Sequence, residues 1–357
     1  MTPTDVARAA VVIPTLDEAA HLPALLAELR ADDGGRVGSI WVADGGSTDA
    51  TVALAHEAAR ADERVRVLAN PGRTQARAMN LAAAHIRAMP EPPEYLVRMD
   101  AHSTYPAGYA SRVVEALERT GAASVVVPMT TLGGGPWQEA GRVIFNSFVG
   151  TGGSPHRTGG DGWVDHGHHA GFRRTVFDEL GGYDESFRAN EDAEYDARVV
   201  ASGGRIYLAG ELAVGYRPRP TLAASWRQFR GYGTGRAQTL LKHRRRIQAR
   251  QLAPVLVTAV VALSTAIAVL RRSARWLAVP AAYVAAVAGA VATVAVRPGE
   301  TGSSDGAKRR ESPGALARAV VLAVTVHIAY GLGYLHELVR RGLGQRRSAR
   351  SGPGGSS

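Results

Sequence analysis

The sequence predicts an α/β fold built on a mostly parallel sheet, followed by transmembrane helices. Over residues 9–130, short apolar runs rich in β-branched residues alternate with segments of helical spacing, and the connections are short. Such alternation is typical of parallel strands with helices on both faces. After residue 250 the composition changes abruptly to long uncharged stretches. These stretches are long enough to cross the hydrocarbon core of a bilayer.

The elements of the first part follow one another regularly. Strands are expected at residues 9–15, 39–44, 64–70, 94–100 and 122–129. Helices are expected at residues 18–30, 50–61, 74–89 and 107–120. Beyond them, residues 131–170 are rich in glycine and histidine and are expected to be irregular, residues 170–187 to form helix and turn, residues 190–204 to form a helix, and residues 205–220 to form strands.

Polar side chains follow several of these strands at the point where the strand ends. In open α/β sheets, ligands bind beyond the carboxyl ends of the strands. That rule predicts one polar edge, which collects Asp17, Glu18, Asp44, Asp100 and His102.

Composition excludes several classes of protein. The chain has no cysteine, which rules out disulfides, thiolate metal sites and cysteine nucleophiles. The formal net charge is +10, and much of the excess lies after residue 217. Binding to nucleic acid would rest on that charge alone. Anionic lipid headgroups next to apolar spans explain it better, so no nucleic-acid partner is expected.

The C-terminal part predicts a membrane domain at residues 252–340 with two to three transmembrane helices. The candidates are residues 252–270, 276–296 and 315–335, the last weakened by Arg318 and His327. The alternative interpretation is buried helices of a soluble protein. We expect a catalytic domain over residues 1–240, a basic juxtamembrane segment over 241–251 and a disordered tail over 341–357.

The membrane orientation is less evident from charge, because both ends of the predicted spans carry arginines. The first residues lack the basic start and long apolar core of a signal peptide. We therefore expect a multi-pass protein of the cell membrane with its catalytic domain in the cytoplasm.

The turn after the second strand, ADGGSTDAT, contains Asp44, two glycines, and Ser47 and Thr48 at a helix start. It matches neither the dinucleotide-binding glycine pattern nor a P-loop. Asp44 can accept a hydrogen bond from the imide N–H of a uracil. The alternative is an Asx turn with a helix cap.

The end of the fourth strand carries a carboxylate and an imidazole, Asp100 and His102, separated by one residue. Oxygen and nitrogen ligands suit Mg²⁺ or Mn²⁺ carrying a diphosphate. The alternative is a helix-capping acid with a surface histidine.

Four acids stand within six residues in NEDAEYDAR, namely Glu191, Asp192, Glu194 and Asp196. Carboxylates this close repel one another, so some should have a raised pKa or basic partners. At a helix start, Asp192 would be held rigidly as a general base. The alternative is a solvated acidic helix start.

Two basic or histidine-rich segments carry weaker signals. His166, His168 and His169 have no second cluster at matching spacing, so a zinc site is not favoured. Arg230 and Arg236 precede the membrane segments, where they suit a diphosphate or lipid headgroups equally well.

Taken together and in order, these motifs resemble the inverting family 2 glycosyltransferases. The segments that carry the resemblance are VVIPTLDEAAHLPALLAEL, VADGGSTDAT, RTQARAMN, MDAH, AGFRRTVFDELGGYDESF and NEDAEYDARVVASGG. The DAHSTYP and NEDAEYDAR versions, followed by YRPRPTLAASWRQFRGYGTGR, resemble the succinoglycan-type enzymes of exopolysaccharide synthesis. The match covers roughly residues 9–240.

The resemblance implies a nucleotide-diphospho-sugar transferase (GT-A) fold and assigns roles to residues. Asp192 would be the catalytic base, and Asp100 with His102 would hold Mg²⁺ or Mn²⁺. GYGTGR departs from the family's Q-x-x-R-W form, which puts Arg230 and Arg236 in doubt. The residues implied for the nucleotide sugar are Pro14, Thr15, Glu18, Asp44, Arg73, Arg77 and Asp100, and those implied for acceptor or diphosphate are Glu191, Arg230 and Arg236.

The resemblance implies a membrane-anchored hexosyltransferase. We expect it to move a sugar, with inversion, from a UDP-sugar to a hydroxyl of a polyprenyl-linked saccharide, in exopolysaccharide or cell-envelope glycan synthesis. The nearest alternative is a polyprenyl-phosphate glycosyltransferase. A processive synthase is disfavoured because Q-x-x-R-W is missing, and an inactive membrane scaffold is disfavoured by the intact set of acids.

Overall fold

The computed structural model describes residues 8–32, 34–153, 160–243, 249–296 and 311–350. The chain forms two compact units, residues 1–130 with 154–217, and residues 131–153 with 218–357. The sequence-based boundary at residue 240 differs from this division. Residues 218–240 belong to the second unit because α10 (Leu222–His243) packs along α13 (Pro313–Arg350).

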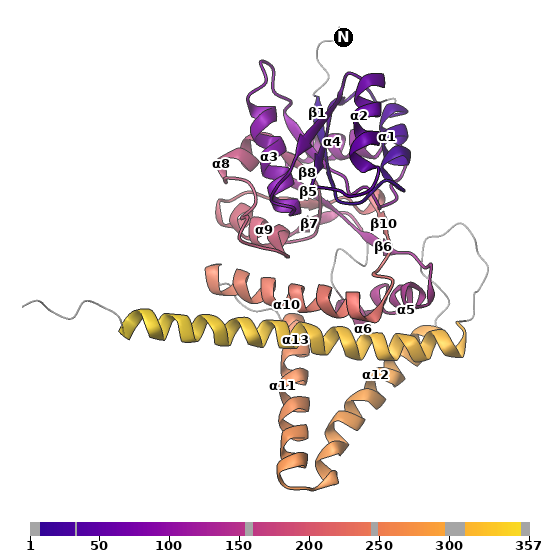
Figure 1. Cartoon of the computed structure of the whole chain (residues 1–357), viewed down its shortest axis with the longest axis vertical. Helices are drawn as coiled ribbons and strands as arrows, with labels where there is room; N and C mark the ends of the chain where they lie inside the picture. The colour runs from indigo at the N-terminus through magenta and orange to yellow at the C-terminus, as the bar shows by residue number, and fades with distance from the viewer. Residues whose placement is uncertain (1–7, 33, 154–159, 244–248, 297–310, 351–357) are drawn as a thin grey trace, which may run out of the picture. The chain divides into compact units, whose positions relative to one another are not determined.

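An eight-stranded sheet forms the centre of the first unit (Figure 1). Its strand order is β3-β2-β1-β4-β8-β5-β9-β7. Its strands are β1 (Ala9–Thr15), β2 (Val37–Asp44), β3 (Val65–Ala69), β4 (Tyr95–Arg98), β5 (Ser124–Val127), β7 (Gly162–Val164), β8 (His168–Arg173) and β9 (Ile206–Leu208). The pairs β1–β2, β1–β4, β2–β3 and β5–β9 are parallel, whereas β8 and β7 run antiparallel to their neighbours. The mostly parallel sheet predicted from the sequence is confirmed.

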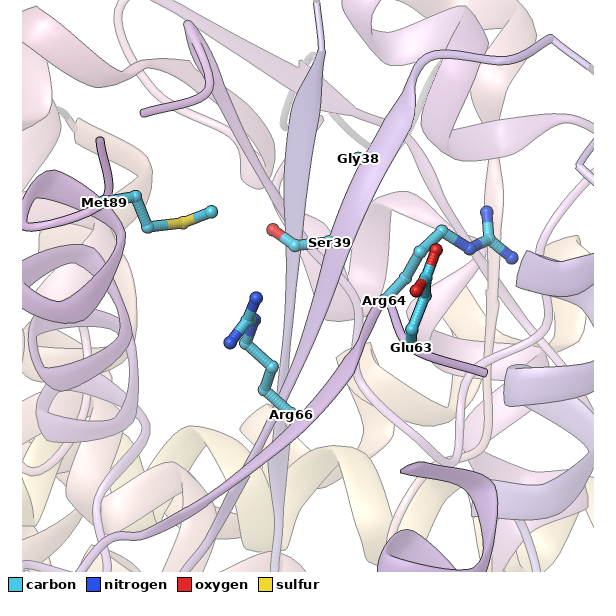
Figure 2. A pocket seen from close by; sticks show the side chains of 6 residues that line it. All are labelled: Gly38, Ser39, Glu63, Arg64, Arg66 and Met89. Carbon is cyan, nitrogen blue, oxygen red and sulfur yellow. The ribbon is translucent and has the colours of Figure 1, made fainter. Parts of the chain in front are cut away.

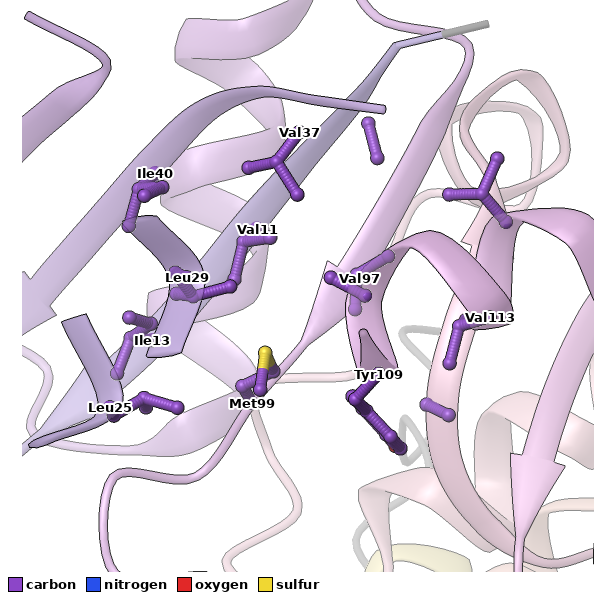
Figure 3. Packing of buried hydrophobic residues seen from close by; sticks show 14 of the residues in the cluster. Val11, Ile13, Leu25, Leu29, Val37, Ile40, Val97, Met99, Tyr109 and Val113 are labelled. Carbon is purple, nitrogen blue, oxygen red and sulfur yellow. The ribbon is translucent and has the colours of Figure 1, made fainter. Parts of the chain in front are cut away.

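Helices cover both faces of the sheet, as the alternation predicted. Because successive strand residues point to opposite faces, Val11 and Ile13 of β1 enter one core while Ala10 and Val12 enter the other. Figure 3 shows the first core, in which Leu25 and Leu29 of α1 and Val113 of α4 pack on the strands. The helices of this unit are α1 (Leu22–Arg30), α2 (Thr51–Ala61), α3 (Gln75–Arg87), α4 (Tyr109–Thr120), α8 (Arg174–Glu179) and α9 (Glu191–Ala201).

Residues 168–173 correct the sequence-based prediction of helix and turn at 170–187. They form β8, which inserts between β4 and β5. The glycine and histidines hide the strand in the sequence, but packing requires the glycine. A Cβ on Gly171 would lie 2.4 Å from Cγ1 of Val113 on α4.

Residues 131–170 are less irregular than predicted, since they contain α5 (Pro136–Phe145), α6 (Phe148–Thr151) and β7. Residues 154–159 lie outside the described part. The start of α5 has recognisable signals, with proline in the first turn and the Gly135 N–H donating to Gln138. Nearby, β6 (Met129–Thr131) and β10 (Val214–Tyr216) form a two-stranded sheet, and a 3-10 turn spans Gly210–Leu212.

Among the described residues, the second unit has three helical spans long and apolar enough to cross a membrane, at Gln251–Leu270, Ala274–Val294 and Pro313–Arg341. Helices α11 (Ala249–Leu270) and α12 (Ala278–Val296) form a hairpin whose connection includes a 3-10 turn, Ala274–Leu277. The predicted tail at 341–357 needs correction, because α13 stays helical to Arg350. Residues 351–357, and residues 244–248 of the predicted juxtamembrane segment, lie outside the described residues.

Candidate active site

The polar edge predicted from the sequence exists in the first unit. Thr15 ends β1, Asp44 ends β2, and Asp100 follows β4 by two residues. Because β8 is antiparallel, its first residue, His168, lies at this same edge. The β4–β8 register pairs Tyr95 with Arg173 and Val97 with Gly171, and its continuation places His168 opposite Asp100.

Asp44 shapes the turn that follows β2. One carboxylate oxygen accepts from the backbone N–H groups of Gly46 and Ser47 at 2.8 and 2.9 Å, and the other accepts from the hydroxyls of Ser47 and Thr15 at 2.5 and 3.3 Å. The Asx turn, left open as an alternative in the sequence, is therefore present. A nucleobase N–H could replace the Thr15 hydroxyl, the most distant donor to Asp44, and leave the turn intact.

The loop after β1 is bound to the loop after β2. Asp17, with a positive φ of 57°, accepts from the backbone and hydroxyl of Thr48 at 2.7 and 3.1 Å. In return, the Asp17 N–H donates to Ser47 and the Glu18 N–H donates to Thr51. These bonds join two connections that are some 30 residues apart, so the rim of the edge is rigid.

Asp100 has a buried basic partner that the sequence-based analysis missed. Arg98, only 6% exposed, donates from Nε to one carboxylate oxygen of Asp100 at 3.2 Å and from a terminal nitrogen to the other at 3.1 Å. Gln75 of α3 adds a bond of 2.7 Å. Burial alone would raise the pKa of Asp100, but the charge of Arg98 holds it well below its usual range. Asp100 is therefore ionised.

His102 pairs with Glu18, which joins two predicted site residues directly. Its Nδ1 lies 2.6 Å from Oε1 of Glu18, and the other oxygen of Glu18 lies 3.0 Å from Nδ1 of His21. In the neutral tautomer that donates from Nδ1 to Glu18, the lone pair of His102 is on Nε2. Carboxylates orient metal-ligating histidines in this way.

The described residues contain no preformed group of three metal-binding side chains. The donor set is nevertheless suitable for a hard divalent cation, with carboxylate oxygens from Asp100 and an imidazole nitrogen from His102. Two protein ligands suffice where phosphate oxygens supply others. The residues present thus fit a cation that arrives with a diphosphate.

The four acids around α9 have four different environments. Glu194 is fully buried and binds Arg198 through both oxygens, at 3.0 and 2.7 Å, while Arg198 also donates to the carbonyl of Gly182. Asp196 is also fully buried and accepts from Nδ1 of His166 at 2.7 Å and Nε2 of His169 at 2.8 Å. These two acids hold the helix in place.

The remaining two acids, Glu191 and Asp192, form the first turn of α9, which follows Asn190 in a left-handed conformation with φ of 61°. Burial and the adjacent Asp192 charge raise the pKa of Glu191. Burial opposes ionisation of Asp192 too, but His166, His169 and Arg98 outweigh it and lower its pKa. The pair thus carries one carboxylate, Asp192, that is held ionised.

His168 lies between the two sets of acids. Burial, and to a lesser extent Arg98, lowers its pKa to about 4, while Asp100 and Asp192 both act in the opposite direction. Its imidazole is therefore neutral at pH 7. The sequence-based analysis noticed this residue only as a possible zinc ligand.

The other predicted residues are placed less decisively. Pro14 and Thr15 lie at the end of β1. Arg73 is exposed with a positive φ of 57°, and Arg77 is paired with Glu185 at 3.7 Å. Arg230 and Arg236 lie on α10 in the second unit, and their roles stay predictions.

A separate pocket of about 360 Å³ lies at the opposite, amino-terminal edge of the sheet (Figure 2). Its two arginines have partners within the fold. Arg64 binds Asp62 at 2.9 Å, and Arg66 lies over the ring of Trp41. The pocket is therefore not the site that the acids form. Its lining residues are Gly38, Ser39, Glu63, Arg64, Arg66 and Met89.

Known proteins resemble this chain along most of its length. The sequence profile of glycosyl transferase family 2 matches residues 10–181. Succinoglycan biosynthesis protein ExoA of Rhizobium meliloti is 41% identical over 330 residues, which cover 92% of this chain and 94% of that protein. The chain belongs to glycosyl transferase family 2. The resemblance noted from the sequence motifs is confirmed.

The fold agrees with this family. The solved structure of mannosyltransferase PcManGT from Pyrobaculum calidifontis, in complex with GDP-Man and Mn²⁺, superposes with a TM-score of 0.54. The superposition covers 95% of this chain and 89% of that chain at 20% identity. The first unit is thus a GT-A-like domain, and this family 2 chain is a glycosyltransferase.

Proposed function

We propose that this glycosyltransferase moves a sugar, with inversion, from a nucleotide-diphospho-sugar to a hydroxyl of a lipid-linked saccharide in exopolysaccharide or cell-envelope glycan synthesis. The observation that carries the proposal is the pair of ionised carboxylates at one sheet edge, Asp100 and Asp192, with Arg98 close to both. Exopolysaccharide synthesis as the setting is supported by the similarity to ExoA.

In the proposed reaction, Asp192 accepts the proton of the acceptor hydroxyl, whose oxygen attacks the anomeric carbon. The bond from that carbon to the diphosphate breaks, and the electron pair leaves with the nucleoside diphosphate. A single displacement inverts the anomeric centre without a covalent enzyme intermediate. The helix start holds Asp192 in place, since its carboxylate accepts a 2.7 Å bond from the Ala193 N–H.

A divalent cation would bind at Asp100 and at His102, whose imidazole is oriented by Glu18. The cation would neutralise the charge that develops on the leaving diphosphate. Mn²⁺ in the PcManGT complex is consistent with this assignment. Arg98 keeps Asp100 ionised and supplies further positive charge behind it.

The nucleotide would lie against the joined loops after β1 and β2, where Pro14, Thr15, Glu18 and Asp44 line the edge. A UDP-sugar is the proposed donor, because Asp44 can accept from a uracil imide. Arg73, exposed on the loop that precedes α3 and close to Gly45, is proposed to contact a phosphate or base of the nucleotide.

The three apolar helices support a membrane anchor, and a polyprenyl-linked acceptor explains why a glycosyltransferase needs one. We propose that the catalytic unit is cytoplasmic, where nucleotide sugars are made.

The test is nucleoside diphosphate release by the purified full chain in mild detergent. The reaction contains Mn²⁺ or Mg²⁺ and one member of a panel of UDP-, GDP- and dTDP-sugars, with or without a lipid-linked saccharide extract. We expect release with one donor, dependent on the extract. Asp192→Asn should lower kcat by about 10²- to 10⁴-fold, the range for loss of a general base.

The control is Glu115→Gln, which removes a carboxylate on the exposed face of α4, and it should leave turnover unchanged. Near wild-type turnover in folded Asp192→Asn would refute the assignment of the base. Product formed on a bare lipid phosphate, without a second sugar, would favour a polyprenyl-phosphate glycosyltransferase instead.

A further inference from the structure

A chain of buried polar groups runs beneath the site. It starts at Asp196, which is fully buried on α9 and binds His169 at 2.8 Å. His169 is itself 1% exposed. Its other ring nitrogen, Nδ1, lies 2.5 Å from the hydroxyl oxygen of Tyr183.

Tyr183 is fixed by more than its hydroxyl. Its backbone N–H donates to Oδ1 of Asn80, and its carbonyl accepts from Nδ2 of Asn80, both at 2.8 Å. The rings of Tyr183 and His169 are nearly parallel and meet edge to edge, with centroids 5.7 Å apart and planes 6° from parallel. Tyr183 is thus anchored to α3 through Asn80 and to α9 through His169 and Asp196.

The chain continues from Tyr183 to Asp100 through α3. Asn80, which binds the Tyr183 backbone, shares this helix with Gln75, which donates to Asp100 at 2.7 Å. Burial raises the pKa of the Tyr183 hydroxyl well above its usual value, and the positive charge of Arg98 opposes this rise. Arg98 in turn binds both oxygens of Asp100. Hydrogen bonds and the shared helix α3 therefore connect Asp196 on α9 with Asp100 beyond β4.

One end of this chain, Asp196, lies close to the proposed base, Asp192. The other end, Asp100, is a proposed ligand of the cation. Asp192 precedes Asp196 by four residues, so the two share one face of α9 one turn apart. Asp100 belongs to the donor side. On the proposed function, we propose that Tyr183 and His169 are positioning residues that set the placement of the base, Asp192, relative to Asp100.

Stability alone does not account for these polar groups. Phe172, Phe177 and Tyr195 pack around His169 and Tyr183 in a compact aromatic cluster. Apolar groups of similar shape would fill this core at no desolvation cost, whereas buried polar chains are expensive unless fully satisfied. Tyr195 shows the contrast, since its buried hydroxyl has no hydrogen-bond partner among the described residues.

This contrast supplies a matched pair of variants. Tyr183→Phe removes the hydroxyl that contacts Nδ1 of His169 and keeps the ring. Tyr195→Phe removes a hydroxyl from the same cluster without breaking the chain. Turnover of the donor found in the panel would be measured for both. We expect Tyr183→Phe to lower kcat by about 10- to 100-fold, the effect of misplacing a catalytic group by about 1 Å. The KM for the donor should change far less, because donor binding is retained.

A second comparison uses His169. His169→Gln keeps an amide donor for Asp196 and an acceptor for Tyr183, whereas His169→Leu keeps neither. The glutamine variant should retain more of the wild-type kcat than the leucine variant. Equal kcat for Tyr183→Phe and the wild type would overturn the proposal. So would equal losses for Tyr183→Phe and Tyr195→Phe, which would indicate packing alone.

An assay-independent measurement separates this proposal from the proposed function. Nitrogen-15 NMR of ring-labelled histidines reports the hydrogen bond at Nδ1 of His169. Tyr183→Phe should shift that signal and Tyr195→Phe should not. If the wild type turns over no donor, the proposed function fails, and an unshifted His169 signal in Tyr183→Phe would then overturn the hydrogen-bonded chain itself.

Discussion

At the scale of single residues, neighbours decide what each carboxylate does. Glu194 and Asp196 are both fully buried, but Arg198 neutralises the first and two histidines bind the second. At the helix start, Asp192 accepts the Ala193 N–H, and the charges of His166, His169 and Arg98 lower its pKa despite burial. A carboxylate thus stabilises the fold at Glu194 and Asp196 and serves the proposed chemistry at Asp192.

Glu18 offers a test of the proposed cation site. Its carboxylate lies 2.6 Å from His102 and would orient that imidazole toward a metal. Glu18→Gln should weaken Mn²⁺ binding by about 10- to 100-fold, as loss of such an orienting partner does in other metal sites. Electron paramagnetic resonance titration of Mn²⁺ into the full chain with UDP present measures this affinity without any turnover.

The matched control for that titration is Glu28→Gln, at an exposed position of α1. It should bind Mn²⁺ like the wild type. Unchanged Mn²⁺ affinity in Glu18→Gln would show that Glu18 serves only the loop and not a cation.

The site could be predicted from the sequence only where position along a strand defines it. Asp44 and Asp100 stand out because each ends an apolar run, and parallel strands bring such ends to one edge. Arg98 stands inside the same run as Asp100 and gives no signal of its own. His166 and His169 meet Asp196 across about 30 residues of chain, a pairing that no local pattern encodes.

At the scale of elements, Arg198 of α9 ties this helix to the turn after α8 and pairs with the buried Glu194. Arg198 binds Glu194 and also donates to the carbonyls of Leu180 and Gly182. Glu194→Gln leaves the partly buried guanidinium of Arg198 without its counter-charge. The cost should lie between that of an exposed pair, about 0–1 kcal/mol, and that of a fully buried one, roughly 3–5 kcal/mol. The thermal midpoint in detergent, followed by intrinsic fluorescence, should therefore fall clearly.

The control for this loss is an exposed pair of the same kind, Arg112 with Glu211, whose N···O distance is 3.3 Å. Exposed pairs contribute about 0–1 kcal/mol, so Glu211→Gln should leave the midpoint nearly unchanged. Similar midpoints for Glu194→Gln and Glu211→Gln would mean that the buried pair does not stabilise α9.

The elements that were predicted correctly are those with a strong period. The strands and helices of residues 9–127 follow the alternation closely, because each buries one recurrent apolar set. The strand β8 was missed because histidine and glycine occupy positions where neighbouring strands have valine. Glycine is required at position 171 because α4 packs too close for a Cβ. This requirement comes from tertiary packing and leaves no local sequence signal.

At the scale of the whole molecule, the second unit contains helices of two kinds. Helix α13 runs parallel to α10, since Thr234 bonds to Gly333 and Gln238 to Glu337 with a constant offset. Close approach requires the glycines there, because a Cβ on Gly233 would lie 1.9 Å from the carbonyl oxygen of Tyr330. Helix α10 carries several arginines and is not a candidate span. Because α13 packs along α10, we expect both helices to lie on the same side of the membrane.

The hairpin of α11 and α12 differs, since each helix is about 30 Å long at 1.5 Å per residue and matches the hydrocarbon core.

The chain has no natural cysteine, so single cysteines can report topology. In intact cells, a membrane-impermeant maleimide should label Ala274→Cys at the hairpin tip from outside. Ala50→Cys in the catalytic unit and Val339→Cys on α13, both exposed positions, should react only after permeabilisation. Labelling of Val339→Cys in intact cells would instead mean that α13 crosses the bilayer. Labelling of Ala274→Cys only after permeabilisation would mean that the hairpin turns back within the bilayer. The protein would then be embedded in one leaflet and would have to reach the lipid-linked acceptor from there.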